Sequence, residues 1–119
     1  MKPVYLINGF LESGKTEFIR FTIGQPYFQI KGKTLIILCE EGEAEYEAPL
    51  LNKCNAVVEV IEEEEDFNPS HLQEIEKKHK PDRIIIEFNG MWNAKNIKLP
   101  WYWKVDQQIT MIMYRRNMM

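Results

Sequence analysis

The chain has little of what marks several large classes of protein. Its 119 residues include only two cysteines, Cys39 and Cys54, so a disulfide-stapled secreted domain is not expected and reduced thiols are the default. No apolar run approaches the roughly 20 residues needed to span a bilayer. The first residues show no charged segment followed by an apolar leader. We therefore expect a cytoplasmic protein with no membrane segment.

Excess positive charge is also missing. The net charge is −3, and most of the 18 acidic residues fall within residues 40–47 and 59–66. Nucleic-acid binding needs a basic patch, and Arg115 and Arg116 near the end are too few to form one. The length suits one small domain, residues 1–119, and we expect no nucleic-acid partner.

What the sequence does contain is a complete phosphate-binding pattern. Residues 9–16 read GFLESGKT, which matches G-x-x-x-x-G-K-[ST]. A β-prone run over 3–8 precedes the pattern, and apolar residues at helical spacing follow it over 15–23. The N–H groups of such a loop, and the start of the helix behind it, bind phosphate oxygens. The candidate nucleotide-binding residues in this loop are Gly9, Glu12, Ser13, Gly14, Lys15 and Thr16.

Three side chains of this loop carry more specific expectations. Lys15 should reach the β- and γ-phosphates and assist catalysis, and the Thr16 hydroxyl should ligate Mg²⁺. Glu12 puts an anion inside the phosphate cradle, so we expect its side chain to point to solvent or across a dimer interface.

Alternating strand and helix signals predict an α/β fold. We expect a P-loop NTPase-type three-layer sandwich with a mostly parallel central sheet of about five strands. The predicted strands are 3–8, 34–38, 56–61, 83–88 and 108–113. An acidic loop should occupy 40–49, and Asn52-Lys53-Cys54-Asn55 should be loop as well.

A second helix is predicted to begin after Asn68 and to end before Pro81. Asn68 is the expected N-cap, with Pro69 at the first helical position. Its buried face should contain Leu72, Ile75 and the apolar part of Lys78 or His79. Glu74 and Lys78 are expected to form an i,i+4 pair.

Glu87 follows the apolar run Ile84-Ile85-Ile86, and Gly90 comes three residues later. An acid directly after a buried strand is where a P-loop enzyme keeps its second Mg²⁺ group. Glu87 would hold a metal-bound water or polarise the attacking one, and Gly90 could offer its N–H to the γ-phosphate. The alternative is an edge carboxylate followed by an Asn-Gly turn.

Other candidates are weaker. The loop containing Glu43 either senses the γ-phosphate or a metal, or is a solvated acidic loop. The acidic run 62–66 is more typical of a solvated turn than of a cation site. The two cysteines lack zinc-site spacing. We expect His71 and His79 to be surface or partly packed residues. The remaining aromatic candidates, for packing, a lid or a partner surface, are Trp92, Trp101 and Trp103.

The phosphate loop, the Glu-Gly-Glu at 41–43 and Ile86-Glu87-Phe88-Asn89-Gly90, in that order, resemble the N-terminal GTPase domain of the CobW family. The resemblance covers most of 3–92 and is strongest to a short bacterial branch of the CobW/HypB/UreG group. It implies a cytoplasmic GTPase that uses GTP and Mg²⁺ and serves a metalloprotein or cofactor-biosynthesis client. It also implies that Glu43 is a metal-responsive carboxylate.

The sequence departs from that family in two places. The Cys-x-Cys-Cys expected after the third strand is replaced by Glu62-Glu63-Glu64-Glu65-Asp66, so soft-metal handling is not supported. No Asn-Lys-x-Asp that would read guanine follows a later strand. The chain ends where a full GTPase would continue, so we expect an incomplete domain, either a fragment or a shortened relative.

Three functions therefore stay open. The first is a weak CobW-type GTPase. The second is a non-hydrolysing remnant that binds nucleotide or a partner. The third is an ATP-dependent small-molecule kinase, for which lid arginines are not evident. A truncated sheet would expose an apolar edge and favour a homo-oligomer.

Overall fold

The computed structural model describes residues 2–9, 23, 32–39, 48–88, 92 and 97–111. Within these residues the helical elements are α3 (Ala48–Lys53), the 3₁₀ turn η1 (Glu64–Asp66) and α4 (Pro69–His79). The strands are β1 (Lys2–Gly9), β2 (Thr34–Leu38), β3 (Ala56–Val60), β4 (Arg83–Glu87) and β5 (Trp103–Met111). None of the described helices is long and apolar enough to cross a membrane.

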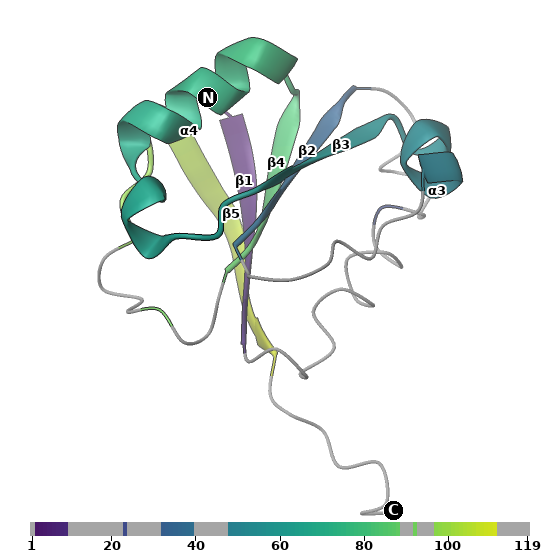
Figure 1. Ribbon diagram of the computed structural model, residues 1–119. Coiled ribbons are helices and arrows are strands. Elements are labelled where there is room, and N and C mark those ends of the chain that lie inside the picture. The colour runs from purple at the N-terminus through teal and green to yellow at the C-terminus, as the bar shows by residue number, and fades with distance from the viewer. Residues whose placement is uncertain are drawn as a thin grey trace, which may run out of the picture.

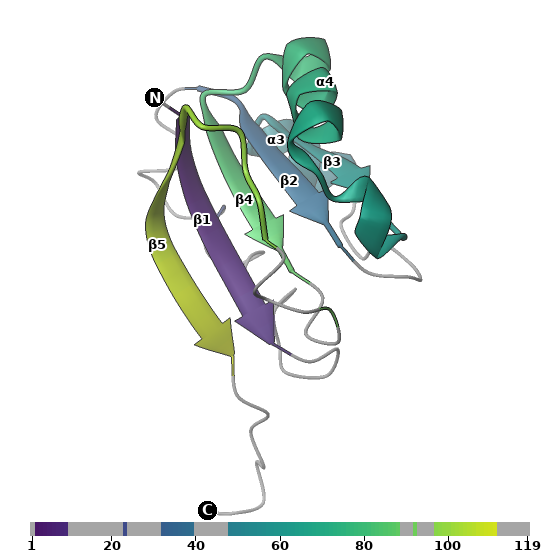
Figure 2. The ribbon, with the colours of Figure 1, turned by 90° about the vertical axis from the view of Figure 1, so that its left-hand side faces the viewer.

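The five strands form one sheet in the order β3-β2-β4-β1-β5 (Figures 1 and 2). Every neighbouring pair is parallel. All five residues of β2 and the last four of β4 are buried, because strands in the middle of such a sheet are covered on both faces. The prediction of an α/β fold with a parallel sheet of about five strands is therefore confirmed.

Apolar side chains are divided between the two faces of the sheet. One cluster lies on the face that α4 covers and includes Leu72 and Ile75 of that helix. The other cluster contains Ile23, and Leu50 and Leu51 of α3 pack against it. Figure 1 shows α4 and α3 on opposite sides of the sheet. Helical residues thus cover both faces, which gives the three layers expected.

The start of α4 is determined by local chemistry. Asn68 has extended backbone angles, and its side chain accepts a hydrogen bond of 2.9 Å from the His71 N–H. Pro69 follows at the first helical position, where its missing N–H costs nothing. At the other end Lys80 is left-handed, with φ 51°, and Pro81 follows. Both predicted ends of this helix are confirmed.

The prediction of a loop over Asn52-Lys53-Cys54-Asn55 is wrong in its first half. Asn52 and Lys53 are the last residues of α3, and Cys54 and Asn55 form the turn into β3. The helix has six residues and no acidic residue in its first turn, so its sequence signals are weak. Packing of Leu50 and Leu51 against the second cluster explains why this segment is helical.

Two further expectations need correction. The last strand starts at Trp103, five residues before the predicted start at 108, because Lys2 pairs with Trp103 and the ladder runs on from there. Exposed residues such as Lys104 and Asp106 disguise this strand in the sequence. The expected Glu74–Lys78 pair is also replaced: Lys78 contacts Glu59 of β3 at 3.1 Å.

Candidate functional site

The carboxyl ends of β1 and β4 lie side by side. Gly9, the first residue of the phosphate-loop pattern, is the last residue of β1, and Glu87 is the last residue of β4. Ile7 pairs with Glu87, and the Phe88 N–H donates to the Ile7 carbonyl at 2.8 Å. The loop pattern therefore begins two residues beyond the position opposite Glu87. Ligands of parallel α/β sheets bind at this edge.

Glu87 is a buried carboxylate, with 1 % of its surface exposed. It lies on an interior strand, between Ile7 of β1 and Leu38 of β2 in the ladder. The Glu87 carbonyl accepts a 2.9 Å hydrogen bond from the Cys39 N–H. The alternative prediction of an edge carboxylate is therefore wrong, whereas the Asn-Gly turn that went with it lies outside the described residues. A buried charge is stable only when cations or donors compensate it, so this position demands such groups around it.

Side-chain alternation places Glu87 on the face opposite α4. The residues on either side of it in the chain, Ile86 and Phe88, belong to the cluster under α4, whereas Ile85 belongs to the other cluster. That other cluster also contains Ile23, a buried helical residue. Ile23 is the last residue of the helix predicted over 15–23. It therefore packs on the face of the sheet that carries Glu87.

The other predicted site residues lie outside the described part of the chain. The structure brings together Gly9, by its backbone, and Glu87. The candidates that remain predictions are Glu12, Ser13, Gly14, Lys15, Thr16, Glu43 and Gly90.

A comparison with protein families identifies the kind of domain that this edge of the sheet is part of. The model of the CobW/HypB/UreG nucleotide-binding domain matches residues 3–116, a range that includes the five strands except for Lys2 of β1. The chain belongs to this family. The predicted resemblance is confirmed, and it identifies the chain as a P-loop nucleotide-binding domain. No curated protein and no solved structure matches the chain.

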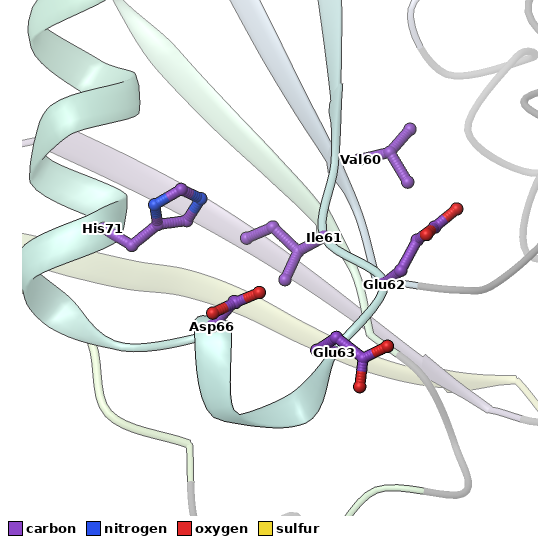
Figure 3. Close-up of a pocket in the computed structure, with 6 residues that line it drawn as sticks. All are labelled: Val60, Ile61, Glu62, Glu63, Asp66 and His71. Carbon is purple, nitrogen blue, oxygen red and sulfur yellow. The ribbon is translucent and has the colours of Figure 1, made fainter.

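In this CobW-family domain an open groove lies beside the carboxyl end of β3 (Figure 3). Its volume is about 390 Å³, and it is lined by Val60, Ile61, Glu62, Glu63, Asp66 and His71. The acidic residues over 62–66 are exposed apart from the half-buried Glu64, and η1 forms within this acidic segment. Among the described residues, no three histidine, cysteine or acidic side chains are arranged to hold a metal ion. The segment is a solvated acidic turn in this structure.

His79 joins α4 to β3. Its Nε2 lies 2.6 Å from Glu59 Oε2, and its side chain is 16 % exposed. Burial alone would raise the pKa of the Glu59 carboxyl, but hydrogen bonds from His79 and Lys78, and their charge, lower it below 4.5. His71 is more exposed and lies 3.7 Å from Glu74. The expectation of surface or partly packed histidines is confirmed.

A buried carboxylate on α4 was missed in the sequence. Glu76 Oε1 accepts hydrogen bonds from the Tyr102 hydroxyl at 2.6 Å and from Trp103 Nε1 at 3.0 Å. The hydrogen bond to Glu76 and burial raise the pKa of Tyr102 above 10. Glu76 lies one turn beyond Leu72 on the apolar face, so helical periodicity alone could have identified it.

Both cysteines and two of the tryptophans lie in or against the apolar core. Cys39 and Cys54 are buried cysteines outside any disulfide, in the clusters on opposite faces of the sheet. Trp103 is buried and Trp92 packs against the cluster under α4, which confirms packing roles for both. Trp101 is 83 % exposed and stacks edge-on against Tyr102.

Proposed function

We propose that this domain binds GTP with Mg²⁺ and hydrolyses it slowly, as a CobW-type GTPase. One observation carries the proposal: buried Glu87 pairs with Ile7, two residues before Gly9 opens the phosphate loop. A P-loop GTPase needs an acid beside the loop to organise Mg²⁺ or the attacking water. Nucleotide binding itself follows from the family.

The residues proposed for the metal suit its chemistry. Mg²⁺ prefers hard oxygen ligands and keeps several of its waters. The Thr16 hydroxyl would bind it directly, and the Glu87 carboxylate would hold one of its waters. A cation at this place would also offset the cost of burying Glu87. Lys15 would neutralise the β- and γ-phosphates, and the Gly90 N–H would contact the γ-phosphate.

The wider role we propose is maturation of a metalloprotein or a cofactor in the cytoplasm. Membership of the CobW/HypB/UreG family supports such a client, and two cysteines without a disulfide fit a reducing compartment. Glu43 would be the metal-responsive carboxylate of this domain, which we take to span residues 1–119. Glu12 would point away from the nucleotide, to solvent or across the interface of a homo-oligomer.

A titration with a fluorescent GTP analogue tests the proposal, followed by measurement of phosphate release. We expect saturable, Mg²⁺-dependent binding and slow turnover in the wild type, and loss of both in Lys15→Ala. Lys33→Ala is the matched control, because Lys33 lies before β2, at the opposite edge of the sheet from Gly9. Turnover that persists in Lys15→Ala would come from a contaminant and would refute the proposal.

A second candidate function is nucleotide binding without hydrolysis or base selection. It is favoured by the position of Asn52 and Lys53, the one Asn-Lys pair of the chain, in α3. Asn55, just after that pair, accepts a hydrogen bond of 3.1 Å from the Thr34 N–H at the start of β2. The pair is therefore at the amino edge of the sheet, away from Gly9 and Glu87. Equal affinity for GTP and ATP without phosphate release would support this second function, and transfer to an added acceptor would instead indicate a kinase.

A further inference from the structure

Three aromatic rings meet at the carboxyl end of β4. The ring centroids of Phe67 and Phe88 are 5.4 Å apart, and those of Phe88 and Trp92 are 5.6 Å apart. Phe67 and Trp92 are separated by 6.3 Å. All three pairs are tilted or edge-on, which is the favourable geometry for aromatic contacts. We call Phe67, Phe88 and Trp92 the aromatic cluster.

The aromatic cluster lies on the face of the sheet that α4 covers, opposite the face that carries the Glu87 side chain. Phe88 follows Glu87 in the chain and is 2 % exposed, in the core under α4. Successive residues of an extended strand point to opposite faces, so Phe88 is anchored on one face and Glu87 is presented on the other. The backbone between them is tied to both neighbours, by Phe88 N–H to Ile7 and by the Glu87 carbonyl to Cys39. Because the two side chains share this backbone, we expect a displaced Phe88 ring to shift the Glu87 carboxylate.

In its contact with Phe88, Phe67 is the residue that other parts of the chain hold in place. It is 6 % exposed, and its N–H donates to the Glu64 carbonyl at 3.0 Å, at the end of η1. The next residue, Asn68, caps α4. Phe67 is thus held between two short-range anchors, and its ring is a rigid support for Phe88 rather than a loose surface group.

Trp92 contacts the rings of both Phe67 and Phe88. Phe88 and Trp92 are four positions apart, and the Glu87-Phe88-Asn89-Gly90 sequence proposed to face the γ-phosphate ends between them. Both Phe88 and Trp92 also contact the Phe67 ring. A ligand that contacts this segment would change the surroundings of the Trp92 indole.

We propose that Phe67 is a positioning residue for the nucleotide site: through Phe88 its ring sets the placement of Glu87, and Trp92 reports nucleotide binding. The role rests on the proposed function, because it assigns Phe67 a part in presenting Glu87 to the metal and the nucleotide. Phe67 itself touches neither. Small displacements of a catalytic group lower the rate far more than they lower affinity.

The test compares Phe67→Leu with Phe67→Tyr, which keeps the ring, and with Ile75→Ala. Ile75 is buried in the same core but comes from α4, so its variant reports general loosening. We expect Phe67→Leu to lower kcat by about tenfold and to change the affinity for the GTP analogue by less than about threefold. Phe67→Tyr should restore most of kcat, whereas Ile75→Ala should lose stability with kcat nearly unchanged.

Tryptophan emission gives a readout that does not require turnover. Mg²⁺ and GTP should change the emission of the wild type, and the change should be absent in Trp92→Phe and reduced in Phe67→Leu. Trp101→Phe is the matched control and should keep the change, because Trp101 is exposed at the other end of the sheet.

The outcomes separate the two proposals. A wild type that binds no GTP analogue would refute the proposed function and the positioning role with it. A wild type that binds, with emission unaltered by nucleotide and with kcat equal in Phe67→Leu and wild type, would overturn the positioning role alone. Equal loss of kcat in Phe67→Leu and Ile75→Ala would also overturn it.

Discussion

Replacement of Glu76 tests whether the buried carboxylate of α4 stabilises the fold. Glu76→Ala removes the acceptor for the Tyr102 hydroxyl and for Trp103 Nε1, and Glu76 is 9 % exposed. Hydrogen bonds to a charged group contribute about 1.5–3 kcal/mol each, and the indole N–H of a residue only 6 % exposed is left without this acceptor. Relief from burying a charge offsets part of that loss. We expect a net decrease of about 2–4 kcal/mol in the free energy of unfolding.

Urea unfolding, followed by tryptophan emission and by far-ultraviolet circular dichroism, measures this loss. With a slope of about 1.5 kcal/mol/M, a loss of 3 kcal/mol lowers the midpoint by about 2 M. Glu76→Gln keeps an oxygen in the same place, so it should lose only about 1 kcal/mol. Equal losses in the two variants, or less than about 1 kcal/mol in Glu76→Ala, would refute the claim that these hydrogen bonds outweigh the cost of burial.

The raised pKa of Tyr102 gives the same contact a dependence on alkaline pH. Because the folded-state pKa lies above 10, the stabilisation is complete below the unfolded value and is lost as the pH rises through the folded value. Glu76→Gln should bring the Tyr102 pKa down toward 10, as measured by ultraviolet titration with Tyr102→Phe as the reference.

Two further predictions concern contacts of α4, one with Glu59 of β3 and one with its own cap, Asn68. Glu59→Gln should reduce stability most above about pH 4.5, because the lowered pKa of Glu59 gives a stabilisation that is lost as the pH falls through the folded-state value. Urea titrations between acid and neutral pH should show the wild type and the variant converging in acid, and parallel curves would contradict the contact with His79 at 2.6 Å. Asn68→Ala should lower stability by about 0.5–2 kcal/mol by removing the cap of α4, whereas Asn68→Ser should keep most of it. Thermal unfolding of the two variants measures this difference. Equal melting temperatures for Asn68→Ala and Asn68→Ser would mean that the side-chain cap adds nothing to stability.

Much of the fold could be predicted where local signals are strong. The run Thr34–Leu38 is a buried strand with the predicted bounds, and α4 begins after Asn68 as expected. Both depend on short-range chemistry: a continuous apolar run in one case and a side-chain cap in the other. The early part of β5 was missed because its exposed Lys104 and Asp106 hide the strand signal, and pairing with β1 decides its start.

For the candidate site, the residue types could be predicted but their surroundings could not. The phosphate-loop pattern and Glu87 are recognisable from spacing and flanking strands, and both lie within the range 3–116 that the family model matches. Whether Glu87 stood at an edge or in the interior depended on strand order, which spacing does not encode. The order β2-β4-β1 buries it.

The sequence by itself determined the buried strands, helix α4, the phosphate-loop pattern and the family of this domain. Those properties depend on near neighbours: alternation, capping and the spacing of glycine, lysine and threonine. The tertiary structure alone decided that Glu87 is buried beside β1, that Glu76 holds β5 to α4, and that Phe67 supports Phe88. These contacts join residues distant in the chain, and their energies arise only once the sheet and α4 have packed together.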